Sequence, residues 1–411
     1  MRSFVSLSTH APAYTLPHRD AVGVYAALRE WLGPKQPHFF WCQGSQVVIG
    51  VGALQSWSGM GPERFHQARQ GIPATPGFWL GGFGFGDRDP SFFFSPCMTV
   101  HGQPGNLCLT VWDANMGDPA ELLALLTHRE MFPPPTVAQP PQDLPLPPLK
   151  DALERALAMI HQGSLEKIVL AAPYTFTPDP LPSLIQILRR LCQLYPDCTV
   201  FACDHPQGGV FLGASPETLV KVRGGQLHTV ALAGSRPRHR DPRQDRALGL
   251  GLLESTKDRY EQHLVTESIL SALQSVGITP RLPSNFPTLR RLSHIQHLQT
   301  PISAALPPHL HILDLVAALH PTAAVAGLPR ERACGYLPHL ETFQRTYYAA
   351  PIGWLDPQGE GEFIVGIRSA WLRPPQVTVY AGAGIVAGSE IERELAEITW
   401  KWQTLLPALI G

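Results

Sequence analysis

Short hydrophobic runs separated by Gly, Pro or Ser fill the first third of the chain. Residues 39–57 are typical of two strands joined by a Gln-Gly-Ser turn, and residues 92–102 and 106–114 each predict one strand. Residues 77–86 alternate aromatic residues with glycine and predict a further strand, because no helix or Lys-Ser/Thr pair follows to make a phosphate loop. One helix is predicted over residues 20–33.

Eight prolines between Phe132 and Leu149 interrupt all periodicity. Such a segment is a stiff, extended connection. We therefore divide the chain into a β-rich part over 1–131, a Pro-rich connection over 132–149 and a second region over 150–411.

In the second region, hydrophobic residues recur alternately at helical and at strand spacing. Helices are predicted over 149–163, 181–194, 255–276 and 311–320, and from Ser389, whose side chain can cap the last helix. Strands are predicted over 167–172, 198–204, 291–303, 361–373 and 376–386, with loops over 236–246 and 280–289.

The stretch 210–238 is predicted to be the centre of this region. Residues 219–223 and 227–232 flank Gly224-Gly225, which is a hairpin signal. Strands and helices do not alternate one for one along the chain. The pattern therefore favours an α+β fold, with large antiparallel sheets packed face to face and helices on the outside.

Composition excludes several classes of protein. A net charge of −1 over 411 residues gives no basic face for nucleic acid. No window has 18 uninterrupted apolar residues, so no membrane span is expected, and the N-terminus lacks the hydrophobic run of a secretory signal. The seven cysteines form no C-x-x-C pair and are expected to be reduced core residues. These features predict a cytoplasmic protein.

A few polar residues occupy positions where chemistry is possible. Lys167 opens an apolar strand, Glu217 follows a Pro-broken strand, and Glu261 and Glu394 lie within two helices. A single glutamate of this kind usually lies on the solvent-exposed face of a helix. Acidic residues on two helices, however, also supply the oxygen ligands that Mg²⁺ needs. Arg368, inside an apolar strand, needs a partner, and a substrate carboxylate suits its geometry.

Seven ordered blocks over residues 150–405 resemble the chorismate-utilising enzymes. They are FLGASPETL, TVALAGSRPR, STKDRYEQHLV, LHPTAAVAGLP, YAAPIGWLD, GEFIVGIRSA and AGAGIVAGSEIERE. The resemblance implies the α+β fold of that family, with the N-terminal third as its variable part.

Two positions separate the branches of this family. Lys167 stands where the water-adding branch has lysine and anthranilate synthases typically have glutamine, and Ala233 stands where the aminodeoxychorismate branch has a nucleophilic lysine. The resemblance therefore implies an isochorismate synthase that serves quinone (menaquinone or phylloquinone) or siderophore biosynthesis. Salicylate synthase is the alternative, followed by an anthranilate or aminodeoxychorismate synthase component or a non-catalytic chorismate-binding protein.

The resemblance also implies residue roles. Lys167 would take a proton from water that attacks ring carbon 2 of chorismate, which requires its neutral amine, and Glu217 would protonate the hydroxyl leaving carbon 4. Mg²⁺ would be held by Glu261 and Glu394, with Asp258 and Glu397 in support. The remaining contacts to chorismate are assigned to Ser235, His320, Tyr348, Arg368, Gly382, Gly384 and Lys401. We expect a monomer or weak homodimer.

Overall fold

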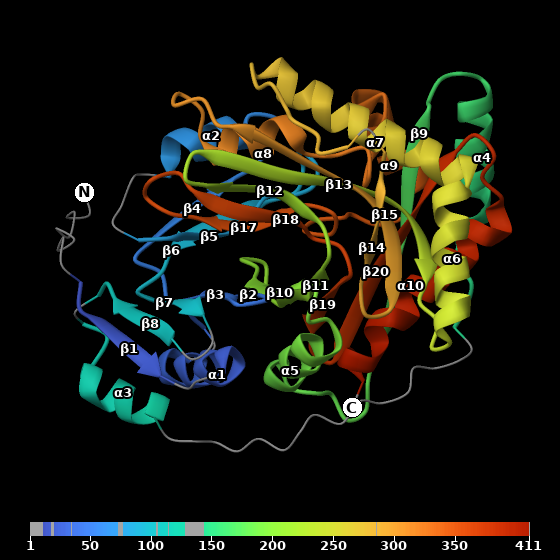
Figure 1. Ribbon diagram of the computed structural model, residues 1–411. Helices are drawn as coiled ribbons and strands as arrows, with labels where there is room; N and C mark the ends of the chain where they lie inside the picture. The colour runs from blue at the N-terminus through green and yellow to red at the C-terminus, as the bar shows by residue number, and fades with distance from the viewer. Residues whose placement is uncertain are drawn as a thin grey trace.

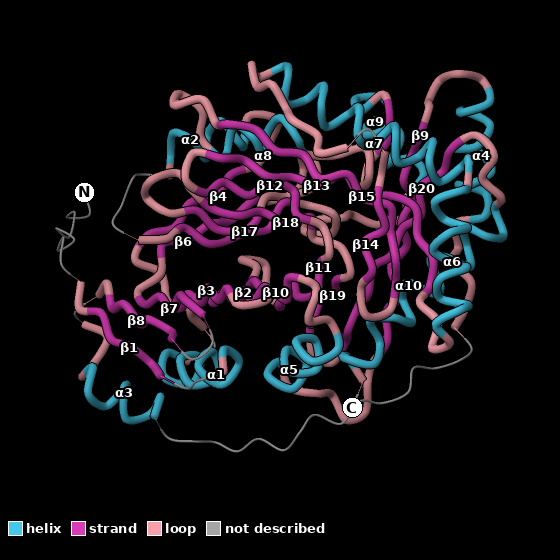
Figure 2. The backbone as a smooth tube through the Cα atoms, in the orientation of Figure 1, coloured by secondary structure: helices cyan, strands magenta, loops and turns pink. Residues whose placement is uncertain are grey.

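The computed structural model describes residues 11–17, 20–33, 35–72, 77–103, 106–113, 115–127, 144–284 and 286–410. In this part of the chain two large antiparallel sheets pack face to face, and helices lie outside them (Figures 1 and 2). The predicted α+β class is therefore confirmed. Most of the predicted connection over 132–149 lies outside the described residues.

The larger sheet has the strand order β1-β8-β7-β3-β2-β10-β11-β19-β20-β9-β16. Its strands are β1 (Ala13–Pro17), β2 (His38–Gln43), β3 (Gln46–Val51), β7 (Met98–Gln103), β8 (Asn106–Val111), β9 (Lys167–Phe176), β10 (Thr199–Asp204), β11 (Val210–Ser215), β16 (Gly327–Leu328), β19 (Ser369–Arg373) and β20 (Gln376–Val386).

The smaller sheet has the order β14-β15-β13-β12-β18-β17-β5-β6-β4. Its strands are β4 (Gln55–Gly59), β5 (Trp79–Gly82), β6 (Ser91–Ser95), β12 (Thr218–Arg223), β13 (Gln226–Pro237), β14 (Thr288–Arg291), β15 (Ile295–Ala305), β17 (Pro351–Leu355) and β18 (Gly361–Val365). Both sheets thus combine strands from either side of the Pro-rich segment.

Helices cover the outer faces of the two sheets. They are α1 (Ala21–Leu32), α2 (Arg64–Gly71), α3 (Pro119–Thr127), α4 (Lys150–His161), α5 (Leu184–Leu194), α6 (Pro242–Glu254), α7 (Thr256–Ser275), α8 (Ile312–Leu319), α9 (Arg330–Leu340) and α10 (Ile391–Leu409). The helix α7 contacts β13 and α8 contacts β12, whereas α1, α5 and α10 contact the larger sheet. No helix among the described residues is long and apolar enough to cross a membrane.

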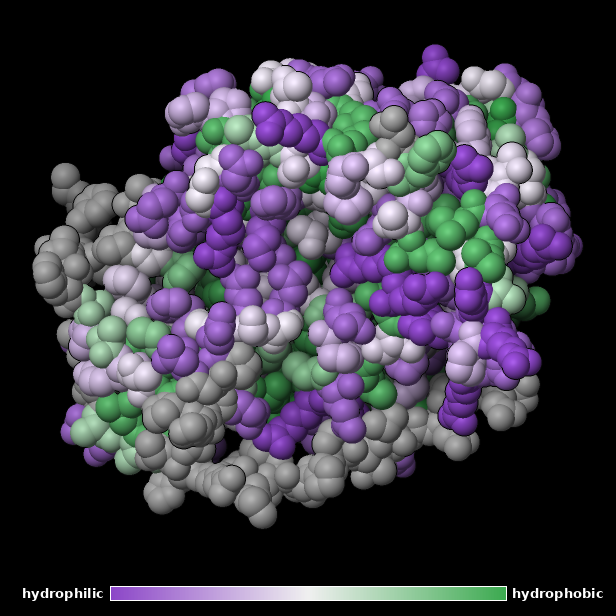
Figure 3. Space-filling view, in the orientation of Figure 1, coloured by the Kyte–Doolittle hydropathy of each residue, from purple (hydrophilic) through white to green (hydrophobic). Residues whose placement is uncertain are grey.

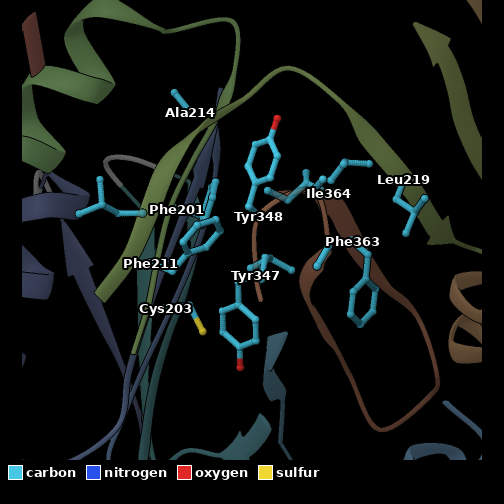
Figure 4. Close-up of a cluster of buried hydrophobic side chains, with 14 of the residues drawn as sticks. Phe201, Cys203, Phe211, Ala214, Leu219, Tyr347, Tyr348, Phe363 and Ile364 are labelled. Carbon is cyan, nitrogen blue, oxygen red and sulfur yellow. The ribbon is translucent and has the colours of Figure 1, made fainter. Parts of the chain in front are cut away.

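Side chains from both sheets fill the space between them (Figure 4). Phe201 and Phe211 come from the larger sheet, Ile364 comes from the smaller one, Tyr347 lies beside them between the sheets, and all four are buried. Burial of each such side chain contributes about 1.5–3 kcal/mol, so this interior holds the sheets in register. On the outer face seen in Figure 3, hydrophobic residues form small patches among polar ones.

The chain crosses between the sheets at two places that matter for the site. It passes from β11 to β12 at residues 216–217, and from β18 back to β19 at residues 366–368. The hairpin of β12 and β13 is confirmed, with Gly224 and Gly225 at φ of 56° and 69° in its turn. Its strands follow β11, so residues 210–238 form three strands where two were predicted.

Several boundaries were predicted wrongly. Residues 361–373 form two strands in different sheets, so Arg368 lies in the break between them with φ of 51°. Residues 92–102 also divide between the sheets, after Ser95. The predicted loop over 236–246 contains the start of α6, which Asp241 caps. Ser389 does not cap α10; its hydroxyl accepts a hydrogen bond from Val386 N–H.

Candidate active site

A cavity of about 90 Å³ lies beside the two crossovers, between α7, α10 and the end of β20. Most of the predicted site residues line it: Glu217, Ser235, Asp258, Glu261, Arg368, Gly382, Gly384, Glu394, Glu397 and Lys401. Ala233, which was used to separate the family branches, lines it too. These residues come from six segments that are far apart in sequence, and the fold brings them together.

Lys167, the predicted base, begins β9 and is completely buried. Its Nζ lies 2.8 Å from Oε1 of Glu261, a residue of α7. Gly384 of β20 lies directly against this pair, because a Cβ built there would come within 2.3 Å of Glu261 Oε1 and 3.1 Å of Lys167 Cε. Only glycine leaves room for the ion pair at this position.

Glu217, the predicted acid, lies in the crossover from β11 to β12 and is 5% exposed. Its N–H donates to Ser215 Oγ at 3.2 Å, and its carbonyl accepts from Val365 N–H at 3.0 Å. Burial raises the pKa of Glu217 to about 7, although the charge of Lys167 opposes the increase. A buried carboxyl with this pKa keeps its proton at neutral pH in a large fraction of molecules, as a general acid must.

Arg368 stands in the second crossover and lines this cavity and a smaller one beside Thr404. Burial lowers its pKa, and its Nη1 donates to Thr404 Oγ1 at 3.1 Å. No carboxylate of the described residues forms an ion pair with it. A buried guanidinium without an internal anion can bind a carboxylate in a two-pronged geometry.

The backbone of β20 supplies further donors beside Arg368. The β9 partners of Gly382 and Gly384 are Ala171 and Val169, and their N–H groups donate to a side chain and to a loop carbonyl instead of to β20. These are therefore non-hydrogen-bonded pairs, in which N–H and C=O both point away from the partner strand. The N–H groups of Gly382 and Gly384 point to the cavity side. The carbonyl of Gly382 points the same way and accepts from Lys401 Nζ at 2.8 Å.

Each predicted metal ligand is paired with its own basic side chain. Besides Lys167 and Glu261, the ion pairs are Lys257–Glu394 at 2.6 Å, Lys401–Glu397 at 2.7 Å and Arg236–Asp258 at 2.8 Å. Burial and the charge of Glu397 raise the pKa of Glu394, even though Lys257 lowers it. Burial also acts to raise the pKa of Glu397, but Lys401 brings it below its usual value.

These acidic side chains fit a divalent cation by their donor chemistry. Among the described residues, no three His, Cys, Asp or Glu side chains form a ready-made metal cluster. The carboxylates of Glu261, Glu394 and Glu397 nevertheless line one cavity from two helices, and burial, together with the charge of Glu397, raises the pKa of Glu394. Mg²⁺ needs only one or two carboxylates when a substrate and water complete its shell.

Two predicted substrate contacts do not line this cavity. His320 follows α8, its Nε2 is bonded to Phe85 O at 2.9 Å, and burial lowers its pKa to about 3. Tyr348 is buried and stacks on Tyr380, with its hydroxyl 3.1 Å from the position of a Cβ on Gly382. Neither residue lines the cavity, so direct contact with a substrate stays a prediction for them.

His297 also belongs to the lining, although the sequence did not single it out. It lies in β15, lines the cavity, and contacts Ser235 Oγ at 3.1 Å and Gly234 O at 3.0 Å through Nδ1. Burial lowers its pKa to about 3, so the ring is neutral. A lone histidine within a strand gives no signal that separates it from an ordinary buried one.

Comparison with known proteins relates residues 120–410 to the family model "Chorismate binding enzyme". The chain is 42% identical over 256 residues to the salicylate biosynthesis isochorismate synthase of Pseudomonas aeruginosa, covering 62% of this chain and 53% of that protein. It is 39% identical over 269 residues to isochorismate synthase DhbC of Bacillus subtilis, covering 63% and 67%.

Among solved structures, the menaquinone-specific isochorismate synthase MenF of Escherichia coli superposes with a TM-score of 0.80. That match has 27% identity and covers 98% of this chain and 95% of that chain. The chain spans about half to two thirds of the two curated relatives named above.

Proposed function

The chain belongs to the chorismate binding enzyme family, and we propose that it is an isochorismate synthase. The reaction adds water at ring carbon 2 of chorismate and expels the hydroxyl from carbon 4. Isochorismate synthases among its relatives support this proposal, at 42% and 39% identity.

The observation that carries the proposal is the state of Glu217. It faces the cavity, and burial raises its pKa to about 7. A hydroxyl leaves an allylic carbon slowly unless it is protonated as it departs. A carboxyl that still holds its proton at neutral pH can supply that proton, and such general acid catalysis typically contributes about 10²–10⁴-fold.

Lys167 is the proposed base that activates water. Its Nζ lies 2.8 Å from Glu261 Oε1, and Glu261 lines the same cavity as Glu217, whereas Lys167 lies behind that lining. The proposed base and a proposed metal ligand therefore share one contact, which links Lys167 to the acidic side chains of the cavity.

Arg368 and the β20 backbone are proposed to bind the enolpyruvyl carboxylate. Arg368 has no internal carboxylate partner among the described ion pairs, and the N–H groups of Gly382 and Gly384 point to the same side. Backbone donors and a guanidinium together hold a carboxylate in one orientation. That orientation would place the ring between Glu217 and Lys167.

We further propose that Mg²⁺ occupies the acidic end of the cavity. Glu261 and Glu394 would hold it, with Asp258 and Glu397 nearby. When bound, it would neutralise the ring carboxylate of chorismate and keep it in place. All four side chains line the cavity.

The branch assignment depends on Lys167 and Ala233, both of which belong to the site. Ala233 lines the cavity as a methyl group, so no lysine amine stands there to attack the ring. The test is incubation with chorismate and Mg²⁺, followed by chromatography of the product. Isochorismate as the product supports the proposal, whereas unchanged chorismate contradicts it.

A further inference from the structure

Lys257 makes an ion pair that sequence analysis did not anticipate. It lies at the start of α7, and its Nζ is 2.6 Å from Glu394 Oε1 on α10. Glu394 is almost fully buried, while the lysine side chain is 31% exposed. The contact joins the two helices that carry the proposed metal ligands.

The pair stands between the inner cavity and an outer recess of about 410 Å³. Glu394 lines both spaces, together with Ser235, Asp258 and Glu397, whereas Lys257 lines only the outer one. The ammonium therefore reaches the carboxylate from the solvent side. A cation in the recess therefore reaches Glu394 on the side where Lys257 is bound.

Lys257 is held differently from the other basic residues of the site. Lys401 is also anchored by the carbonyl of Gly382, and Lys167 is completely buried. Lys257 has no second hydrogen-bond acceptor within the part of the chain that the structure describes. It also lies within electrostatic range of Glu261 and Glu397. A single contact to Glu394 thus keeps its ammonium beside three carboxylates.

We propose that Lys257 is a placeholder cation, which holds Glu394 in the metal-free protein and is displaced when a divalent cation binds there. The inference rests on the proposed metal site. One carboxylate oxygen cannot bind both the ammonium and the metal, so the two cations compete. Displacement leaves Lys257 free at the mouth of the recess.

Competition predicts a gain of affinity when the lysine is removed. In Lys257→Met the metal no longer has to displace an ammonium, and repulsion between Glu394 and Glu397 is relieved only by the metal. We expect Mg²⁺ to bind on the order of tenfold more tightly, equivalent to about 1.4 kcal/mol. A lysine with a merely structural role would leave the affinity unchanged or weaken it on substitution.

The experiment is calorimetric titration of MgCl₂ into substrate-free protein. Wild type, Lys257→Met and Lys257→Gln are compared with Lys221→Met as the matched control. Lys221 forms an ion pair of the same kind with buried Glu362 at 2.7 Å, in the sheet and away from the cavity. The melting temperature in excess chelator and in excess Mg²⁺ is the second measurement.

The expected result is tighter Mg²⁺ binding and a larger Mg²⁺-induced rise in melting temperature in both Lys257 variants, with Lys221→Met binding Mg²⁺ like wild type. Unchanged or weaker binding in folded Lys257 variants would overturn the placeholder role and leave the proposed metal site intact. If wild type itself binds no Mg²⁺, both the placeholder role and the metal site are wrong.

Discussion

Lys167 Nζ and Glu261 Oε1 lie 2.8 Å apart, so the proposed base and a proposed metal ligand form one buried ion pair. Through this contact the proposed base interacts directly with one of the proposed metal ligands. An oxygen of Glu261 that serves a metal ion is no longer available to Lys167. Metal occupancy and base activation are therefore expected to change together.

The first prediction concerns Lys167. Lys167→Ala should lower kcat by about 10²–10⁴-fold, because water loses its proton acceptor. Chorismate binding should persist, since Arg368 and the β20 backbone are unchanged. Steady-state kinetics and equilibrium binding of chorismate measure the two effects separately. Wild-type kcat in Lys167→Ala, with Lys221→Ala as the control for loss of a paired lysine, would rule out the base role.

The second prediction concerns the pH dependence that Glu217 imposes. Its pKa is raised to about 7 by burial, and a general acid works only while protonated. Activity should therefore fall as pH rises above about 7, and Glu217→Gln should lose about 10²–10⁴-fold in kcat together with that alkaline limb. The profile of log kcat against pH from 5 to 9 measures both. An alkaline limb that survives in Glu217→Gln would have to come from another group.

The third prediction is that Glu217 destabilises the folded protein at high pH. The folded state keeps the proton up to about pH 7, whereas the unfolded chain loses it near 4.5. The folded state therefore binds more protons in that window, so the contribution of Glu217 to stability falls as pH rises through it. At roughly 1.4 kcal/mol per pH unit, the loss is about 3 kcal/mol.

Glu217→Gln should accordingly unfold at a higher urea concentration than wild type at pH 8, and at a similar one at pH 4.5. Urea unfolding at the two pH values tests this directly. The inactive variant would thus be the more stable one, as expected where a buried group is kept for function. An equal difference at both pH values would contradict the raised pKa.

The local parts of the fold were predictable from the sequence. The hairpin of β12 and β13 follows from Gly224-Gly225, because a two-residue turn with positive φ is encoded where it occurs. The position of α7 was predicted within one residue at each end, since its hydrophobic face repeats at helical spacing.

The passage of the chain between the sheets was not predictable. Residues 361–373 are apolar on both sides of Arg368, because β18 and β19 are both buried, although in different sheets. Hydrophobic pattern alone cannot separate one long buried strand from two short ones. The break is marked only by the positive φ of Arg368, a conformation that few arginines adopt and that tertiary contacts impose.

The sequence allowed us to predict which residues belong to the candidate site. It did not allow us to predict which of them form ion pairs with one another. Resemblance to a family pointed to Glu217, Glu261 and Glu394. The pairing of Glu394 with Lys257 joins residues of two helices whose packing depends on the whole fold. His297 was missed for the same reason, because only the folded chain brings it beside Ser235.

The fourth prediction concerns the metal. Activity should disappear in excess chelator and return when Mg²⁺ is added. Glu394→Gln should raise the Mg²⁺ concentration needed for half-maximal activity by at least about tenfold, because a neutral amide is a poor ligand for a hard cation. Titration of activity against free Mg²⁺ measures this, with Glu392→Gln, an exposed residue in the first turn of α10 that lines neither the cavity nor the recess, as the control. Full activity in chelator would remove the metal from the proposal.

The fifth prediction concerns the nucleophile and the end of the reaction. Lys167 activates water in the proposed mechanism, and residue 233 is an alanine, which offers no amine to attack the ring. In water labelled with heavy oxygen, one labelled atom should therefore enter at ring carbon 2, even with abundant ammonium present. Mass spectrometry of the isolated product locates the label. Nitrogen incorporated into the ring of the product would instead overturn the assignment to the water-adding branch.

Isochorismate should accumulate without release of pyruvate, and pyruvate in the mixture would move the protein to the salicylate synthases. A sharper probe is Ala233→Lys. Ala233 is only 8% exposed and lines the cavity, so a lysine side chain there is expected to extend into it. Water then has no room to approach carbon 2, and isochorismate formation should fall by at least about 10²-fold. Unchanged turnover in Ala233→Lys would show that residue 233 does not face the reacting carbon.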